Sequence, residues 1–193
     1  MDLLNYAKII EPCQRNWDEQ FIIPEEHIKY ILDVCTTVPT KQNINVYSLV
    51  VITNRQVMSS IFKKAAYDHS PKSRTYMRNS QVNANALFIW TEGTEKAEDQ
   101  SDIDIAIGIS SGAAALAAAE LGYKTGFCKC YMNTVLQKIL AKNKVKRHNN
   151  SYLMLGIGKP NEKFDKRTPV VNGKPQMPQD AQGDKDILIR RVY

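Results

Sequence analysis

Residues 103–131 read IDIAIGISSGAAALAAAELGYKTGFCKCY, a long run of small and apolar residues that leads into two cysteines. Helical spacing over 103–121 places small or apolar side chains on nearly every side of the predicted helix, and Gly122 suits a left-handed cap at its end. Ser101 and Asp104 have the capping-box spacing at its start. A helix that is apolar on all sides has to be buried, so we expect it at the centre of the domain or in a dimer interface.

Helices and strands alternate on both sides of this segment. Short apolar runs rich in β-branched residues predict buried strands, and apolar positions at helical spacing predict amphipathic helices. Strands are expected at 46–53, 84–90, 152–158 and 187–192, and further helices at 2–10, 24–38 and 54–67. This order indicates an α/β (α+β) fold, a mixed sheet flanked by helices.

The length of 193 residues and the hydrophobic content of 43% indicate a single domain with one well-buried core. The stretch 168–186 has too few large apolar residues to add to that core. We therefore assign residues 1–167 to the globular domain and residues 168–193 to an extended C-terminal arm.

A membrane helix needs about 18–20 apolar residues in succession, and we expect none in this sequence. The N-terminal residues MDLLNYAKIIEP lack the basic flank and the small-residue cleavage site of a signal peptide. The expected location is therefore the cytoplasm, with no membrane contact.

Half of the four cysteines form the sequence Cys128-Lys129-Cys130. A metal site would need two further soft ligands at a suitable spacing, and His69 and His148 are isolated in polar segments. A redox pair is a second reading, although the usual dithiol spacing is CxxC. The third reading is a loop whose backbone matters more than its sulfur atoms, and we expect reduced thiols and no metal.

The formal net charge of +6 has a local source, because the run KILAKNKVKRH (138–148) holds five basic residues and no acid. Such a patch can bind nucleic acid or an anionic cofactor, or it can be a solvated helix end and loop. Because aromatic residues are not interleaved with the basic ones, nucleic acid is not the expected partner.

Four stretches in chain order resemble the FMN-dependent nitroreductase family. VPTKQNINVYSLVVI (38–52) is similar to the family segment aPSxxNxQPWxF, with Asn45 and Val46 at the Gln-Pro positions, and AALAAAELGYKTGFCKC (114–130) is similar to its Ala-rich helix and LG exit. YLMLGIGKPNEKFDKRTPV (152–170) resembles the strand that is followed by a basic pair. EPCQRNW (11–17) stands at the family's RRSxRxF, where only Arg15 and Trp17 keep their type.

The resemblance implies a nitroreductase-like fold and an FMN cofactor that carries the redox chemistry, with no catalytic side chain of the protein. It implies a homodimer in which the arm packs on the partner, and NADH or NADPH as the reductant of the flavin. A nitroaromatic, quinone or similar small acceptor would then take the electrons in a ping-pong cycle.

The residues that match the family motifs are the candidate flavin-binding residues. Arg15, Lys166 and Arg167 are expected at the phosphate, and the backbone N–H of Lys129 or Cys130 at the hydride-accepting edge of the ring. The full expected set is Cys13, Arg15, Thr40, Lys41, Gln42, Asn43, Cys128, Lys129, Cys130, Lys166 and Arg167.

Two alternatives stay open at this point. One is a flavoprotein of the same fold with other chemistry, such as dehalogenation, dehydrogenation or flavin breakdown. The other is a flavin-free binding protein, which Glu11 and Pro12 favour because they replace the first two arginines of the family motif. The sequence does not identify the physiological acceptor or choose between NADH and NADPH.

Overall fold

The computed structural model describes residues 2–66, 79–145, 150–161, 170–171 and 174–175. Its central sheet contains β1 (Tyr47–Ile52), β2 (Ala86–Glu92), β3 (Lys124–Cys128) and β4 (Ser151–Gly158) in the spatial order β1-β2-β4-β3. All three strand pairs of this sheet are antiparallel. The small pair β5 (Val170–Val171) and β6 (Lys174–Pro175) is also antiparallel.

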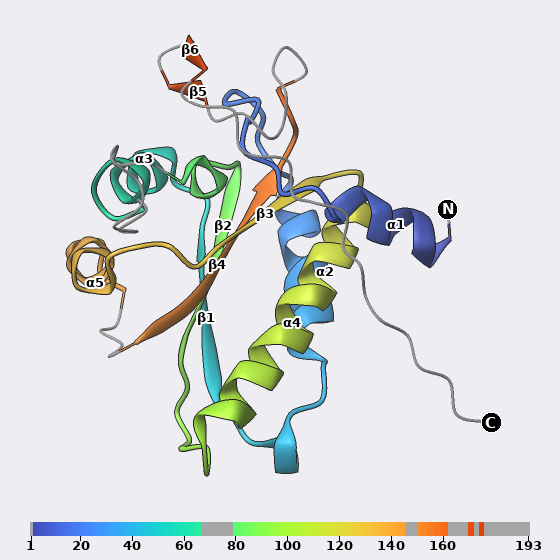
Figure 1. Cartoon of the computed structure of the whole chain (residues 1–193), viewed down its shortest axis with the longest axis vertical. Coiled ribbons are helices and arrows are strands. Elements are labelled where there is room, and N and C mark those ends of the chain that lie inside the picture. Colours follow the sequence, from blue (N-terminus) through green and yellow to red (C-terminus); the bar gives the residue numbers. More distant parts are fainter. Residues whose placement is uncertain (1, 67–78, 146–149, 162–169, 172–173, 176–193) are drawn as a thin grey trace.

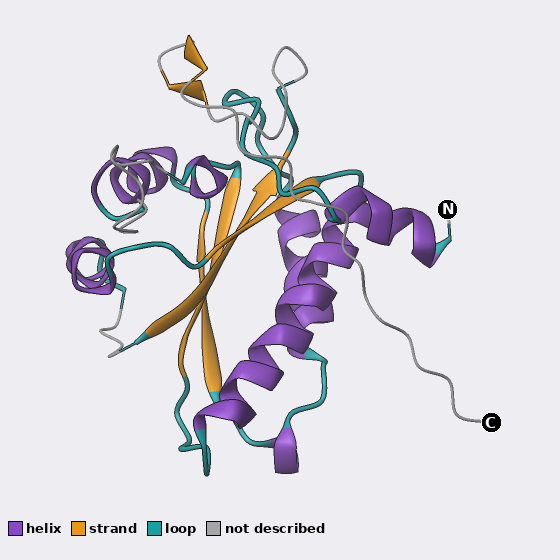
Figure 2. Ribbon diagram, in the orientation of Figure 1, coloured by secondary structure: helices purple, strands orange, loops and turns teal. Residues whose placement is uncertain are grey.

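Helices cover both faces of the sheet, as Figures 1 and 2 show. One face packs against α1 (Leu3–Ile10), α2 (Glu25–Thr36) and α4 (Gln100–Glu120), and the other against α3 (Arg55–Lys64) and α5 (Asn133–Lys142). Two short 3₁₀ turns, η1 (Lys41–Asn43) and η2 (Ser80–Val82), precede β1 and β2. The predicted α/β fold with a sheet flanked by helices is therefore confirmed.

Strand β2 runs through the middle of both cores. Phe88 and Trp90 point into the core that α2 and α4 share with the sheet, whereas Leu87 and Ile89 point into the core with α3 and α5. Successive side chains of a strand point to opposite faces, so one continuous apolar run fills both cores. This explains why the sequence of β2 shows no polar alternation.

Helix α4 begins earlier than expected. Its N-cap is Asp99, whose carboxylate accepts a hydrogen bond from the Asp102 backbone N–H, so the prediction of Ser101 as the cap is wrong. The Ser101 hydroxyl donates to the same carboxylate instead. A carboxylate at this position satisfies an unpaired N–H of the first turn as well as a serine does, and it also favours the positive end of the helix.

The expectation that α4 is buried on every side holds for only part of the helix surface. Ala106, Ala114 and Ala118 are buried, whereas Ile105 and Ile109 are 61% and 43% exposed within one chain. Gly108 and Gly112 lie on the same open face, with no atom of the described chain within 4 Å of an added Cβ. The helix therefore presents an apolar, small-residue face that this chain does not cover.

The expectation that no segment passes as a membrane helix also needs correction. By length and composition, α4 is apolar enough to cross a membrane, with a mean hydropathy of 1.4 over an 18-residue window. Half of that window is buried inside the protein. Packing against α2 and the sheet accounts for the apolar residues of its buried half.

The structure adds β3 to the expected strands. Residues 124–128 were expected to be part of a loop, yet they pair with β4 from Lys124 opposite Gly158 to Cys128 opposite Met154. The predicted arm, the expected strand at 187–192, and His69 and His148 lie outside the described residues, apart from the short β5–β6 pair.

Candidate functional site

Segment 13–17 crosses the end of the sheet where β3 and β4 pair. Its Gln14 N–H donates to the Thr125 carbonyl at 2.8 Å. Gly126 and Gly156 lie opposite each other beneath this crossing, and a Cβ on either would overlap a carbonyl oxygen of Gln14 or Gln81. The two glycines therefore let two loop segments lie directly on the sheet.

Trp17 fixes the far end of the segment. Its side chain is 5% exposed, its indole N–H donates to the Ser80 carbonyl at 2.9 Å, and its backbone forms an isolated bridge to Pro160. These contacts join segment 13–17 to η2 and to the residues that follow β4, so the three segments form one connected unit at this end of the sheet.

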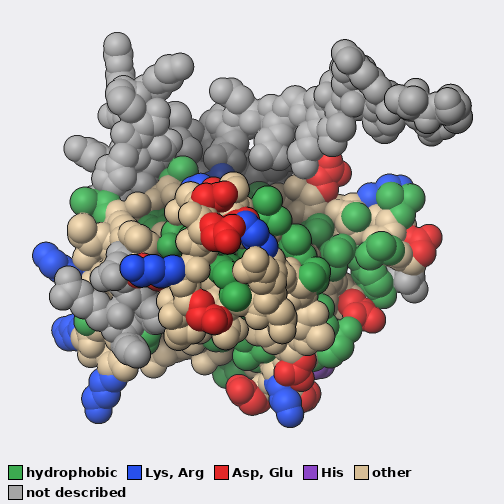
Figure 3. Space-filling model, turned by 90° about the horizontal axis from the view of Figure 1, so that it is seen from below, with side chains coloured by type: hydrophobic (Ala, Val, Ile, Leu, Met, Phe, Trp, Pro, Cys, Tyr) green, Lys and Arg blue, Asp and Glu red, His purple; other side chains and the backbone are tan. Residues whose placement is uncertain are grey.

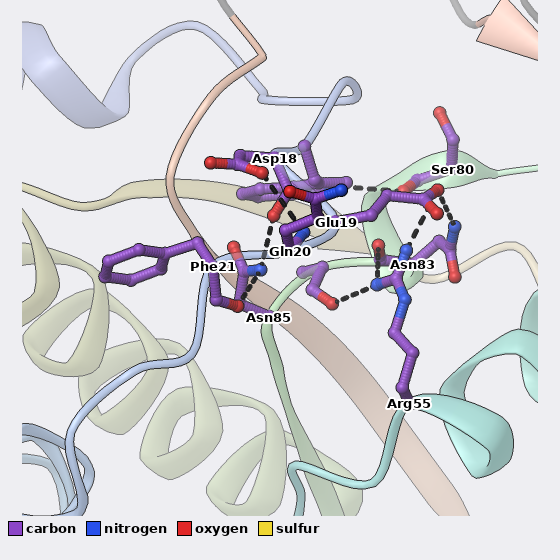
Figure 4. A network of polar contacts seen from close by, with 10 residues as sticks. Asp18, Glu19, Gln20, Phe21, Arg55, Ser80, Asn83 and Asn85 are labelled. Atoms are coloured by element: carbon purple, nitrogen blue, oxygen red, sulfur yellow. Dashed lines mark hydrogen bonds and ion pairs between the residues drawn. The ribbon is translucent and has the colours of Figure 1, made fainter.

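Arg55 and Asn85 continue this support toward residues 18–21 (Figure 4). The Arg55 guanidinium donates to the Asn83 carbonyl at 2.8 Å and contacts the Glu19 carboxylate at 2.9 Å. The Asn85 amide donates to the carbonyls of Asp18 and Phe21, each at 2.7 Å. The loop that carries the candidate residues is thus held by named hydrogen bonds rather than by apolar packing alone.

Lys129 and Cys130 form an exposed turn directly after β3. The side-chain amide of Asn79 donates to the Cys130 carbonyl at 2.9 Å and so fixes the orientation of that peptide. Within the described part of the chain, neither the Lys129 N–H nor the Cys130 N–H has a hydrogen-bond acceptor. Two backbone donors are therefore available at one exposed loop.

Cys13 lies next to this turn, since its thiol contacts the Phe127 carbonyl at 3.7 Å. Burial raises the pKa of the Cys13 thiol, and the nearby Arg15 guanidinium partly opposes that rise. Burial raises the pKa of Cys128 much further, to about 12. Both thiols are therefore protonated at neutral pH and are poor nucleophiles.

Arg15 places a buried positive charge beneath this turn. It is 9% exposed, and its Nη1 donates to the Gln81 Oε1 at 3.2 Å, while its Nε has no partner in the described structure. Burial lowers its pKa, and the thiols of Cys13 and Cys128 oppose that shift. No carboxylate of the described residues forms an ion pair with it, so its charge is uncompensated there.

The segment from Thr40 to Asn43 lies at the other end of the chain's body. Lys41 forms ion pairs with Glu98 at 2.6 Å and with Asp102 at 3.0 Å, in the first turn of α4. These hydrogen bonds raise the pKa of Lys41. α4 is about 30 Å long, so its last turn, after which β3 begins, lies far from the Lys41 ion pair with Asp102 in its first turn (Figure 1).

Two residues of this segment have a left-handed backbone. Gln42 and Asn43 have φ values of 54° and 57°, and both side chains are exposed. Asn tolerates this conformation, but for Gln it costs energy. Backbone strain of this kind is concentrated at ligand-binding positions.

The structure therefore brings together only part of the predicted set. Cys13, Arg15 and Cys128–Cys130 are neighbours, Thr40–Asn43 lie apart within the same chain, and Lys166 and Arg167 lie outside the described residues. Asn79 and Gln81 support the site but were not predicted, because an isolated polar residue before a strand has no distinctive spacing.

The neighbouring group fits a flavin in two respects. The N–H groups of Lys129 and Cys130, which have no acceptor in the described part of the chain, suit the hydrogen-bond-accepting edge of a ring, and the buried Arg15, whose Nε has no partner there, suits a negatively charged ligand. No group of three or more His, Cys, Asp or Glu in the described residues has the arrangement of a metal site.

No family model matches this sequence, and no curated protein matches it. Solved structures do match its fold. An iodotyrosine deiodinase bound to FMN and 3-iodo-L-tyrosine is 15% identical, with all of both chains covered and a TM-score of 0.66. An FMN-dependent nitroreductase from Clostridium difficile R20291 is 14% identical, with 84% of this chain and 90% of that chain covered and a TM-score of 0.63.

A third structure, CLA-ER, is an enone reductase of gut-bacterial fatty acid saturation. It is 14% identical, with 97% of each chain covered and a TM-score of 0.66. The three proteins carry out different reactions on one architecture. The chain therefore has the nitroreductase-like fold, and at these identities the likeness establishes the fold alone.

Proposed function

We propose that this protein is an FMN-dependent oxidoreductase that takes electrons from NADH or NADPH and reduces a small planar acceptor such as a nitroaromatic or a quinone. One observation carries the proposal: among the described residues, the Lys129–Cys130 turn presents two backbone N–H groups without an acceptor, beside a buried arginine without an ion-pair partner. The fold supports it, because two of the solved structures named above are described as FMN-dependent or FMN-bound.

Bound FMN would supply hydride and electron transfer, so the protein's part is binding, orientation and electrostatics. The N–H of Lys129 or Cys130 donates to the ring edge, and the Asn79 amide keeps that peptide in place through the Cys130 carbonyl. The Lys129 side chain is exposed at the same turn and adds positive potential where reduction places negative charge.

The phosphate of the cofactor needs several cationic or N–H donors. Arg15 supplies one charge from beneath the turn, and Lys166 and Arg167 are proposed as the others from the family resemblance. Cys13 and Cys128 line the wall of the same site as neutral thiols, because burial keeps their pKa values high.

A homodimer joins the two separated parts of the predicted site. Lys41 pairs with the first turn of α4, whereas β3 and the Lys129–Cys130 turn follow the last turn of this helix, so we infer that Thr40–Asn43 reach a shared flavin from a second copy. The open face of α4, with Ile105, Gly108 and Ile109, is an apolar surface suited to such a contact.

The absorption spectrum of the purified protein tests the cofactor directly. A yellow protein whose flavin bands bleach on anaerobic addition of NADPH or NADH, and return with a quinone, supports the proposal. A colourless protein that takes up no added FMN overturns it and supports the flavin-free binding protein.

A second candidate function is different chemistry on a bound flavin. The similar structures favour this candidate, because they include a deiodinase, a nitroreductase and an enone reductase that share one architecture. A protein that binds FMN and is reduced by NADPH, yet transfers no electrons to nitroaromatics or quinones, supports this candidate. Halogenated phenols and enones are then the next acceptors to assay.

A further inference from the structure

A groove of about 480 Å³ lies between α3 and α5. The Met132 N–H donates to the Ala65 carbonyl at 2.9 Å, which ties the start of α5 to the end of α3. The groove is lined by Asn54, Gln56, Val57, Ser60, Lys64, Val135, Lys138, Ile139, Lys142 and Asn143.

The charge of this groove is of one sign. Lys64 comes from α3, and Lys138 and Lys142 come from α5, while no acidic residue lines the groove. None of the three forms an ion pair with a described residue. Figure 3 shows Lys and Arg side chains projecting from the edge of the molecule that carries α3 and α5, at the left of that view.

The spacing of the two lysines on α5 works against the helix itself. Lys138 and Lys142 are four residues apart and so project from one face, where like charges destabilise a helix. The N-terminal end of α3, capped by Asn54, adds a further positive potential at the groove. A bound anion would reduce the repulsion between the two lysines and would interact favourably with the N-terminal end of α3.

Below the lysines, the groove offers apolar contact and polar recognition together. Val57, Val135 and Ile139 are partly or fully buried and form an apolar surface. The side-chain amides of Gln56 and Asn143 provide both donors and acceptors at its rim. The volume is within the range of small-molecule sites, so the groove suits a compact ligand rather than a polymer.

We propose that the α3–α5 groove binds a nucleoside phosphate. The lysines hold the phosphate groups, the apolar surface covers one face of the base, and the amides hydrogen-bond to base or ribose. Such a ligand has two sources, a free nucleotide that acts as an effector or the adenosine part of a nicotinamide coenzyme. The groove shares no residue with the candidate flavin site, and the inference does not depend on the oxidoreductase function.

Calorimetric titration of the purified protein, with whatever cofactor it carries, tests the inference at low salt with ADP, NADP⁺, NAD⁺ and inorganic phosphate as probes. The test variant is Lys138→Gln with Lys142→Gln. Its matched control is Lys63→Gln with Lys144→Gln, which removes the same charge from exposed lysines that do not line the groove. Circular dichroism verifies that both variants fold.

We expect ADP to bind the wild type and the control alike, and to bind the test variant about tenfold more weakly. Tighter binding of NADP⁺ than of NAD⁺ and ADP identifies the 2′-phosphate of the coenzyme as the ligand group. Binding of ADP as tight as that of NADP⁺ identifies a free nucleotide as the ligand. The inference is overturned if ADP binds no more tightly than inorganic phosphate, or if both variants lose ADP equally.

Discussion

Gly126 and Gly156 face each other across β3 and β4, and the carbonyl oxygens of Gln14 and Gln81 occupy the space where their side chains would stand. This pair of glycines decides how closely the site loops approach the sheet. It also yields the first prediction.

Gly156→Ala should destabilise the protein by about 2 kcal/mol, because its Cβ would overlap a backbone atom that no rotamer change can move away. Urea unfolding measures the loss. The control is Thr134→Ala, an exposed position of α5 at which alanine favours the helix. Equal stability of Gly156→Ala and wild type would refute the close approach.

The second prediction concerns alkaline pH. Burial raises the pKa of Cys35 to about 11 and of Cys128 to about 12. In the unfolded chain both thiols have a pKa of about 8.5, so above that pH the unfolded state binds fewer protons than the folded state. The free energy of unfolding should therefore be insensitive to these thiols below about pH 8 and fall at higher pH, at up to about 1.4 kcal/mol per pH unit for each thiol.

Urea unfolding between about pH 7 and pH 10 checks this slope. Above that range the buried Tyr131, whose pKa is also raised, adds to the loss. Cys128→Ala should remove part of the slope, because Cys35 and Cys13 also have raised pKa values, and a slope identical to wild type in this variant would contradict the assignment.

The third prediction concerns the dimer. Ile105→Arg should convert the protein to a monomer and weaken FMN binding in parallel, because it places a charge on the open face of α4. Ile22→Arg is the control, since Ile22 is 84% exposed and belongs to the loop before α2 rather than to the open face of α4. Sedimentation velocity gives the mass, and a wild-type protein that is already monomeric would remove the two-chain site.

The fourth prediction concerns the flavin's potential. Lys129→Glu should lower the reduction potential of bound FMN by roughly 30 mV, because a negative charge at the exposed turn disfavours the added electrons. Lys144→Glu makes the same charge change beyond the end of α5 and should leave the potential unchanged. Anaerobic titration against a reference dye measures both, and equal shifts would show a general charge effect rather than a local one.

The fifth prediction tests whether Asn79 affects FMN binding by holding the Lys129–Cys130 turn rather than by stabilising the whole protein. Asn79→Ala removes the hydrogen bond to the Cys130 carbonyl and should weaken FMN binding about tenfold. Asn143→Ala removes a comparable bond to the Ile139 carbonyl at the end of α5 and should lower stability without changing FMN affinity. Fluorescence titration with FMN gives the affinities, and unchanged binding in Asn79→Ala would contradict its role.

Much of the fold could be predicted because its central strands are continuous apolar runs. The strands expected at 46–53, 84–90 and 152–158 correspond to β1, β2 and β4. Strand β3 was missed because its sequence KTGFC has neither alternation nor a β-branched run. It is a strand because Gly126 pairs with Gly156, and a long-range pairing of this kind leaves no local sequence signal.

The candidate site was predicted less completely, for a physical reason. Cys13, Arg15 and Cys130 were found through motif order, and the structure places them together. Asn79 and Gln81 act through single side-chain hydrogen bonds that have no periodicity. The position of Thr40–Asn43 relative to the other residues depends on the tertiary fold, and in the proposed dimer also on a second chain, which a motif does not specify.

The crossing of segment 13–17 over β3 and β4 also sets the order of events at synthesis. Gln14 leaves the ribosome early, but its partner Thr125 follows more than a hundred residues later, and the partner of Asp18 is Lys159. Contacts this distant in sequence form slowly, because the intervening chain must first be closed into a loop. The first part of the candidate site to be translated is therefore among the last to be completed, and newly made chains must finish β4 before a ligand can bind there.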